Sequence, residues 1–153
     1  MDKYEFNLKV EQLNKLVKSG DYKAAMRITD TIDWSRVHNA GLLTTVSEVY
    51  EKNGEYREAR EVLLLAYDRA PVGKRALYRL TMLALKEGDI SEAQAYYKEY
   101  TEISPQDSRK YLMEYHIAVA KGYDINKKIR ILEKYCDIEK TDEQWKYELA
   151  VLY

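Results

Sequence analysis

Apolar residues recur along this chain at the three- and four-residue spacing of one helical face, in stretches separated by polar, glycine-containing turns. Each stretch would bury a single face, so the pattern predicts amphipathic helices that pack on one another. Only two prolines and six glycines occur in 153 residues, which favours long helices joined by short turns. The sequence therefore predicts an all-α fold, with these helical stripes: Tyr56, Ala59, Leu63, Ala66 and Ala70; Leu77, Leu80 and Ala84; Ile125, Ile129, Leu132 and Cys136.

The turns between the stripes repeat one phrase. Its four copies are SGDYKAA at 19–25, NGEYREA at 53–59, EGDISEA at 87–93 and KGYDINK at 121–127, and each glycine lies 34 residues from the next. A glycine after a helical stripe can take the left-handed conformation that ends a helix, and an acidic residue after it favours the start of the next helix. Small residues at one offset, Ala25, Ala59 and Ala93, predict close approach of two antiparallel helices.

Proline marks the ends of two repeats, and other residues replace it elsewhere. Pro71 and Pro105 are 34 residues apart and are predicted to end the second helix of their repeats. The first repeat has Trp34 and Val37 in that region. The fourth has Lys127 at the alanine position and Glu139 at the proline position, so we expect a looser fourth helix pair.

A further helix is predicted near the C-terminal end of the sequence. The pair Thr141 and Gln144 has the spacing of a capping box, and the apolar residues Trp145, Leu149 and Leu152 follow it. This helix either caps the fourth pair or begins a fifth repeat. The chain is accordingly either a piece of a longer protein or one that ends in a capping helix.

The 34-residue period, the glycine-acid turn, the small alanine and the closing proline together resemble the tetratricopeptide-repeat (TPR) family. The best match is the second repeat, with Leu43, Val46, Tyr50, Gly54, Tyr56, Ala59, Leu63, Ala66 and Pro71. The resemblance implies a right-handed superhelical solenoid of antiparallel helix pairs with about nine helices. It also implies a single array over 1–153, with repeats at about 6–39, 40–73, 74–107 and 108–141 and an extra helix at 142–153.

Composition narrows the classes of partner. The 25 basic and 26 acidic residues leave a net charge of -1, which gives no general attraction to nucleic acid or to an anionic membrane. No apolar stretch approaches the roughly 20 residues that a membrane span needs. The single cysteine, Cys136, allows no internal disulfide, and we expect it to be a small apolar residue of the core. By its likeness to bacterial TPR proteins whose array is cytosolic, we expect a cytoplasmic location.

No catalytic pattern accompanies the two histidines. His38 is expected in the turn between the first two repeats and His116 on a first helix, and neither has a nucleophile or paired carboxylate at a motif-like spacing. We therefore predict that the protein is not an enzyme and needs no metal or cofactor. Most of the fifteen tyrosines are expected to pack between helices.

In TPR proteins the first helix of each pair lines a concave groove, so the resemblance implies a site that can be proposed by register. The apolar residues of this groove would contact a peptide or helix of a partner protein, and its arginines would bind the carboxylates of that partner. The alternative is a structural spacer, or a self-association module acting through the last helix, in a longer, membrane-tethered protein. The predicted groove residues are Val10, Asn14, Arg75, Tyr78, Arg79, Met82, Arg109, Leu112, Met113 and His116.

Some TPR domains hold a C-terminal carboxylate with a clamp of two Asn, two Lys and one Arg. By resemblance Asn14 and Arg79 match two members of that clamp, and Arg75 replaces one Lys. Val10 and Thr45 stand where two further members belong, and Glu48 is expected to pair with Arg79. This departure favours a solvated surface network over carboxylate capture.

Overall fold

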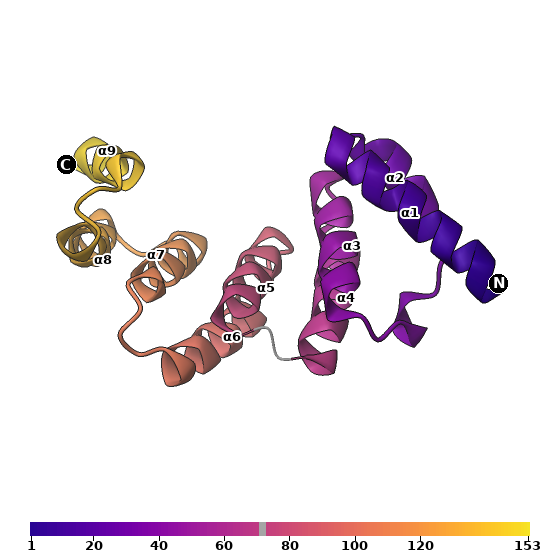
Figure 1. Cartoon of the computed structure of the whole chain (residues 1–153). Coiled ribbons are helices and arrows are strands. Elements are labelled where there is room, and N and C mark those ends of the chain that lie inside the picture. Colours follow the sequence, from indigo (N-terminus) through magenta and orange to yellow (C-terminus); the bar gives the residue numbers. More distant parts are fainter. Residues whose placement is uncertain (71–72) are drawn as a thin grey trace. The chain divides into compact units, whose positions relative to one another are not determined.

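The computed structural model describes residues 1–70 and 73–153, and these residues form nine α-helices, one short 3-10 helix and no β-strand (Figure 1). The predicted all-α fold with about nine helices is confirmed. The helices are α1 (Lys3–Ser19), α2 (Tyr22–Thr29), η1 (Trp34–Arg36), α3 (Ala40–Lys52), α4 (Tyr56–Arg69), α5 (Lys74–Lys86), α6 (Ile90–Ile103), α7 (Arg109–Lys121), α8 (Ile125–Ile138) and α9 (Glu143–Leu152).

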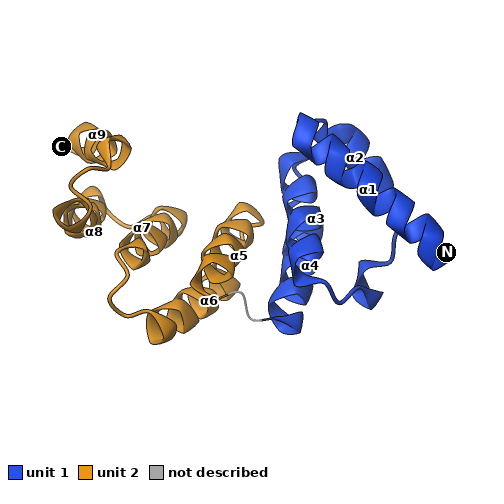
Figure 2. Cartoon of the chain, viewed as in Figure 1, with its two compact units in different colours: residues 1–72 blue, residues 73–153 orange. Residues whose placement is uncertain are grey.

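The helices group into two compact units (Figure 2). Unit 1 spans Met1–Val72, and in it α1 packs on α2, α2 on α3, and α3 on α4. Unit 2 spans Gly73–Tyr153, and in it α5 packs on α6 and α7, while α8 packs on α7 and α9. The single array and its right-handed superhelical course stay predictions.

Glycine in the left-handed conformation ends the first helix of each pair, as predicted. Gly20, Gly54, Gly88 and Gly122 have φ between +72° and +81°. Immediately after Gly20 the Asp21 carboxylate accepts a hydrogen bond from the Ala24 amide at 3.1 Å, which caps α2. The chain thus reverses direction within two residues, and the next helix returns antiparallel to the first.

The core of each unit lies between its paired helices. Ala25, Ala59 and Ala93 are each 0% exposed, which confirms that a small residue at this offset lets two helices approach closely. Large aliphatic residues of the first helices fill the remaining space, including Leu43 in unit 1 and Leu77 in unit 2. These contacts supply the apolar burial that holds each pair together.

The fourth turn is one residue longer than the others. Asp124, two residues after Gly122, caps α8 by accepting from the Lys127 amide at 2.9 Å, so α8 begins one residue later than its counterparts. The alanine position therefore falls on half-buried Lys128, and Lys127 is exposed. The predicted stripe is wrong at Ile125, which is 49% exposed; because of the shifted register, the buried face consists of Ile131, Leu132 and Tyr135.

Helix boundaries elsewhere refine the sequence-based expectations. Asp142, rather than Thr141, caps α9, because its carboxylate accepts from the Trp145 amide at 3.4 Å. The helix α6 ends at Ile103, two residues before Pro105. Pro71 lies outside the described residues.

The second helix of the first repeat is short. It has 8 residues, whereas α4, α6 and α8 each have 14. Trp34 of η1 is 5% exposed, and its indole Nε1 donates to the Thr29 carbonyl at 2.9 Å. The Trp34 ring also meets Phe6 of α1 edge-on at 6.5 Å between centroids. The turns missing from α2 are thus replaced by a loop anchored on one tryptophan.

Candidate functional site

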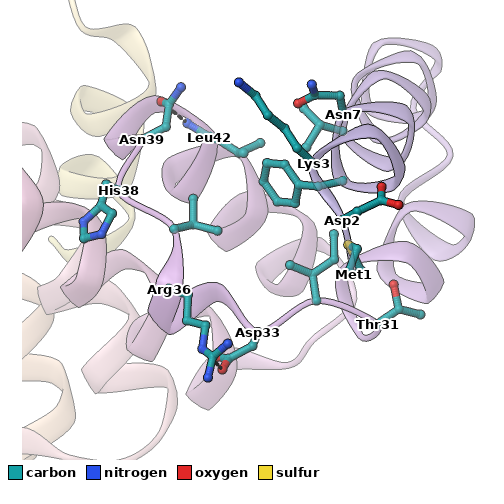
Figure 3. Close-up of a pocket in the computed structure, with 14 residues that line it drawn as sticks. Met1, Asp2, Lys3, Asn7, Thr31, Asp33, Arg36, His38, Asn39 and Leu42 are labelled. Carbon is teal, nitrogen blue, oxygen red and sulfur yellow. Dashed lines mark hydrogen bonds and ion pairs between the residues drawn. The ribbon is translucent and has the colours of Figure 1, made fainter.

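A pocket lies beside α1 where the second helix is cut short (Figure 3). Its volume is about 770 Å³, which is within the range of ligand-binding pockets in proteins. Its walls come from the first turns of α1, from the loop that contains η1, and from the start of α3. The half-buried apolar side chains that line it are Phe6, Val10, Ile32, Val37 and Leu42.

Polar side chains occupy the rim of this pocket on opposite sides. Figure 3 shows Lys3, Asn7 and Asn39 along one edge, and Arg36 with Asp33 across from them. The Asp33 carboxylate lies 3.8 Å from the Arg36 guanidinium. Hydrogen bonds from the Ser35 hydroxyl and amide hold the pKa of Asp33 below its ordinary value. The Asp33 carboxylate therefore contacts Ser35 and Arg36 of the same loop.

A second candidate surface is formed in unit 2 by the first helices α5 and α7. Apart from Glu114, their charged residues are all basic: Lys74, Arg75, Arg79, Lys86, Arg109, Lys110 and Lys121. The Glu114 carboxylate already accepts a hydrogen bond from Tyr97 of α6 at 3.5 Å. These two helices therefore carry an excess of positive charge, although the whole chain is nearly neutral.

Aromatic stacking fixes part of this basic surface. The Arg109 guanidinium carbon lies 5.7 Å from the centroid of the Tyr78 ring, a cation–π distance. Burial raises the pKa of Tyr78, and the nearby Arg109 charge lowers it in part. Arg75 is exposed and lies one helical turn from Tyr78 and Arg79. We call Arg75, Tyr78, Arg79 and Arg109 the basic face.

Lys74 belongs to the same end of α5 but is already paired. Its amine lies 2.5 Å from the Asp107 carboxylate, which also accepts from the Arg109 amide at 2.9 Å. Burial raises the pKa of Asp107, and these hydrogen bonds outweigh it, so the pKa is lowered overall. Asp107 thus neutralises Lys74 and holds the start of α7, where Arg109 lies.

The predicted groove residues fall into different environments. In unit 1, Val10 lines the pocket and Asn14 is exposed on α1. In unit 2, Arg75 and Arg109 are exposed, whereas Tyr78, Arg79 and Met82 are half-buried. Leu112 and Met113 are 5% and 0% exposed, because α7 turns them into the core. They lie beneath the surface of α7.

His116 is covered by the last helix. Its ring lies 5.5 Å from that of Trp145 in α9, and Trp145 also meets Tyr115 at 5.7 Å and Tyr135 at 6.4 Å, all edge-on. Burial lowers the pKa of His116. Leu149 and Leu152 of α9 pack, with Trp145, against the neighbouring core residues Leu112, Leu132 and Tyr135. His116 therefore lies in the packing between α7 and α9.

Three further findings concern metal binding, the Glu48 carboxylate and membrane-spanning helices. Among the described residues, no group of three His, Cys, Asp or Glu side chains could hold a metal ion. The Glu48 carboxylate accepts from the Tyr22 hydroxyl at 3.4 Å within unit 1. Its expected pairing with Arg79 would join the two units and stays a prediction. No helix in the described part of the chain has the length and apolarity to cross a membrane.

Reasoning from sequence missed the pocket, because it assumed a full second helix in the first repeat. A signal was present: the segment TDTIDWSRVHN at 29–39 places turn-forming Asp30 and Asp33 where the other repeats continue their second helix. The pocket-lining residues thus overlooked include Lys3, Phe6, Ile32, Val37 and Asn39.

Comparison with known proteins gives one family match and several structural matches. The tetratricopeptide-repeat family model matches residues 74–107, which contain α5 and α6. No curated protein matches the sequence. A tetratricopeptide repeat protein from Parabacteroides merdae is similar in structure, with TM-score 0.81 and 16% identity over 99% of this chain and 59% of that one.

Two other solved structures are similar at comparable identity. MamA from Desulfovibrio magneticus RS-1 has TM-score 0.72 and 18% identity over 95% of this chain and 82% of that one. YrrB, described as a TPR protein with an unusual peptide-binding site, has TM-score 0.65 and 16% identity over 95% of this chain and 74% of that one. At these identities the matches establish the fold.

Proposed function

Because this chain has the tetratricopeptide-repeat fold, with a family repeat at residues 74–107, we propose that it is a protein-interaction scaffold whose basic face binds an acidic, extended segment of a partner. Helical-repeat proteins present extended surfaces to partners rather than enclosed catalytic sites. The observation that carries the proposal is the charge of α5 and α7, which are basic apart from Glu114.

The residues of the basic face have complementary roles in such binding. Arg109 is held over the Tyr78 ring, so less side-chain freedom is lost when its guanidinium meets a carboxylate. Arg75 is exposed on α5, one helical turn before Tyr78. An extended peptide could therefore contact Arg75 and Arg109 with alternate side chains. The peptide-binding site named for YrrB supports a peptide as the type of partner.

The test is capture of partner proteins from lysate by the immobilised chain and by Arg75→Glu/Arg109→Glu. A matched control is Lys18→Glu/Lys23→Glu, which makes the same change in charge at exposed sites of unit 1. We expect proteins that the wild type and the control retain to be lost by the double arginine variant, and their retention to weaken with added salt. Equal retention by all three proteins would refute the basic face as the binding surface.

The outer face of α9 favours a second candidate function, self-association. Tyr147 and Val151 lie one helical turn apart on α9 and are 70% and 64% exposed. A second copy covering this face would bury both side chains. Sedimentation over a wide range of protein concentration tests this: dimerisation lost in Tyr147→Lys/Val151→Lys supports it, and a monomer throughout refutes it.

A further inference from the structure

The pocket of unit 1 combines an apolar floor with a rim of hydrogen-bond donors. The floor consists of Phe6, Val10, Ile32, Val37 and Leu42, which come from α1, the η1 loop and α3. These side chains are half-buried and enclose a volume of about 770 Å³. Such a floor favours a large apolar side chain, because transfer of an aliphatic or aromatic group from water is worth about 1.5–3 kcal/mol.

Three side chains on the rim, Asp2, Asp33 and Asn39, use an oxygen for hydrogen bonds within the protein. Asp2 accepts from the Glu5 amide at 2.8 Å, and Asp33 accepts from Ser35. The Asn39 oxygen Oδ1 accepts from the Leu42 amide at 3.0 Å, which fixes the orientation of that side chain and leaves its Nδ2 group as a donor.

The donors of one edge have no such partners. No described residue accepts a hydrogen bond from the Lys3 amine, the Asn7 amide group or Asn39 Nδ2, and all three lie along the same edge in Figure 3. Lys3 is the cation on this edge, while Arg36 across the pocket is paired with Asp33. A ligand that complements this edge must supply acceptors, and a carboxylate does so with favourable charge.

We propose that the pocket of unit 1 binds a short segment of a partner protein in which one large apolar side chain is followed directly by an Asp or Glu. The apolar side chain enters between Phe6 and Val37, and the carboxylate accepts from Lys3, Asn7 and Asn39. This site uses none of the residues of the basic face, so it stands whether or not that face binds a partner.

The size of the pocket supports this occupant. Its volume of about 770 Å³ exceeds what one side chain needs and accommodates the adjoining backbone. The helix α2 stops at Thr29, and the irregular 30–39 segment follows where the other repeats continue their second helix. The pocket lies between this segment and α1. It is therefore a consequence of the irregular first repeat.

The experiment is a titration of the ¹⁵N-labelled full chain, followed by NMR, with the capped peptide acetyl-Gly-Phe-Glu-Ser-Gly-amide. The comparison peptides replace Glu by Gln, or Phe by Ala, and a fourth, acetyl-Gly-Phe with a free C-terminus, tests a terminal carboxylate. We expect saturable shifts at pocket residues, and a dissociation constant about fivefold weaker for the Gln peptide, since a charged acceptor makes the stronger hydrogen bond.

Protein variants locate the site. Lys3→Glu should weaken binding of the Glu peptide by about tenfold and bring it close to the Gln peptide. Lys15→Glu is the matched control, since it makes the same charge change on the same helix at an exposed residue outside the pocket, and it should leave binding unchanged. Val37→Asp should abolish binding through the floor, and retained dispersion of the spectrum shows that the variant is folded.

Four results would overturn the proposal. One is an absence of saturable shifts at pocket residues, and another is equal binding of the Glu and Gln peptides. The third is equal weakening by Lys3→Glu and Lys15→Glu, which would indicate general charge attraction. Tighter binding of the peptide with a free C-terminus would overturn the assignment to a side-chain carboxylate.

Discussion

Replacing Trp34 by alanine tests whether this side chain substitutes for the missing turns of α2. Trp34 is only 5% exposed, and its ring contacts Phe6. A tryptophan buries about 150–250 Å², which at about 25 cal/mol per Å² corresponds to about 4–6 kcal/mol. The alanine side chain restores a small part of this burial free energy, and the loop can partly close the cavity. We therefore expect the free energy of unfolding to fall by about 3–5 kcal/mol.

The hydrogen bond can be separated from the packing. In Trp34→Phe most of the apolar surface remains, but the Thr29 carbonyl loses the indole donor at 2.9 Å. That carbonyl still accepts from the Ile32 amide at 3.3 Å, so the cost should lie near the lower limit for a lost hydrogen bond, about 1 kcal/mol. The two variants should therefore differ by about 2–4 kcal/mol.

The assay is urea unfolding monitored by circular dichroism, with Tyr4→Ala as the control. Tyr4 is an aromatic residue of the same unit that is 72% exposed, and its removal should cost less than about 0.5 kcal/mol. With a denaturant slope of about 2 kcal/mol per M, Trp34→Ala should lower the midpoint by roughly 1.5–2.5 M. A loss of stability no larger than that of the Tyr4 control would refute the role assigned to Trp34.

Three further predictions concern the turns and the last helices. Gly88→Ala should destabilise the chain by about 1–2 kcal/mol in thermal unfolding, because Gly88 has a φ of +79°. The added Cβ meets no other atom, so the cost is backbone strain alone, and Gly88→Asn should cost less. Burial lowers the pKa of His116 from 6.5, so the unfolded chain binds the proton more tightly and stability should fall as the pH drops below 6.5; the loss should be smaller in His116→Gln. Lys128→Ala should leave thermal stability unchanged or raise it, whereas Lys127→Ala should lower it by about 0.5 kcal/mol through loss of the contact with the Tyr123 ring at 3.8 Å.

The regular repeats could be predicted from sequence because their structure is local. A glycine with positive φ ends a helix by its own backbone freedom, and an aspartate cap bonds an amide three residues away. Ala59 and Ala93 lie at the same offset after such turns, and each is fully buried. Features of this kind need no knowledge of distant contacts, so the 34-residue period was enough to find them.

The candidate sites were harder to predict because they depend on register and on contacts distant in sequence. One extra residue in the fourth turn moved the buried face of α8, so Ile125 became exposed. Counting along the first helices placed Leu112 and Met113 in the predicted groove. The helix α7 packs on α5, α6 and α8, so several of its faces are covered. Leu112 and Met113 lie on covered faces and are buried. His116 is covered by Trp145, which lies 29 residues further along the chain.

The two candidate surfaces differ in how they depart from a regular repeat. The basic face requires no irregularity, since any repeat can carry arginine on its first helix without disturbing the core. The unit-1 pocket arises from a shortened helix, and the loop that replaces the missing turns is held by Trp34. Maintaining that loop takes a buried indole, its hydrogen bond and the contact with Phe6. The same tryptophan that stabilises the first repeat thus holds the loop that borders the pocket with the apolar floor and the Lys3, Asn7 and Asn39 edge.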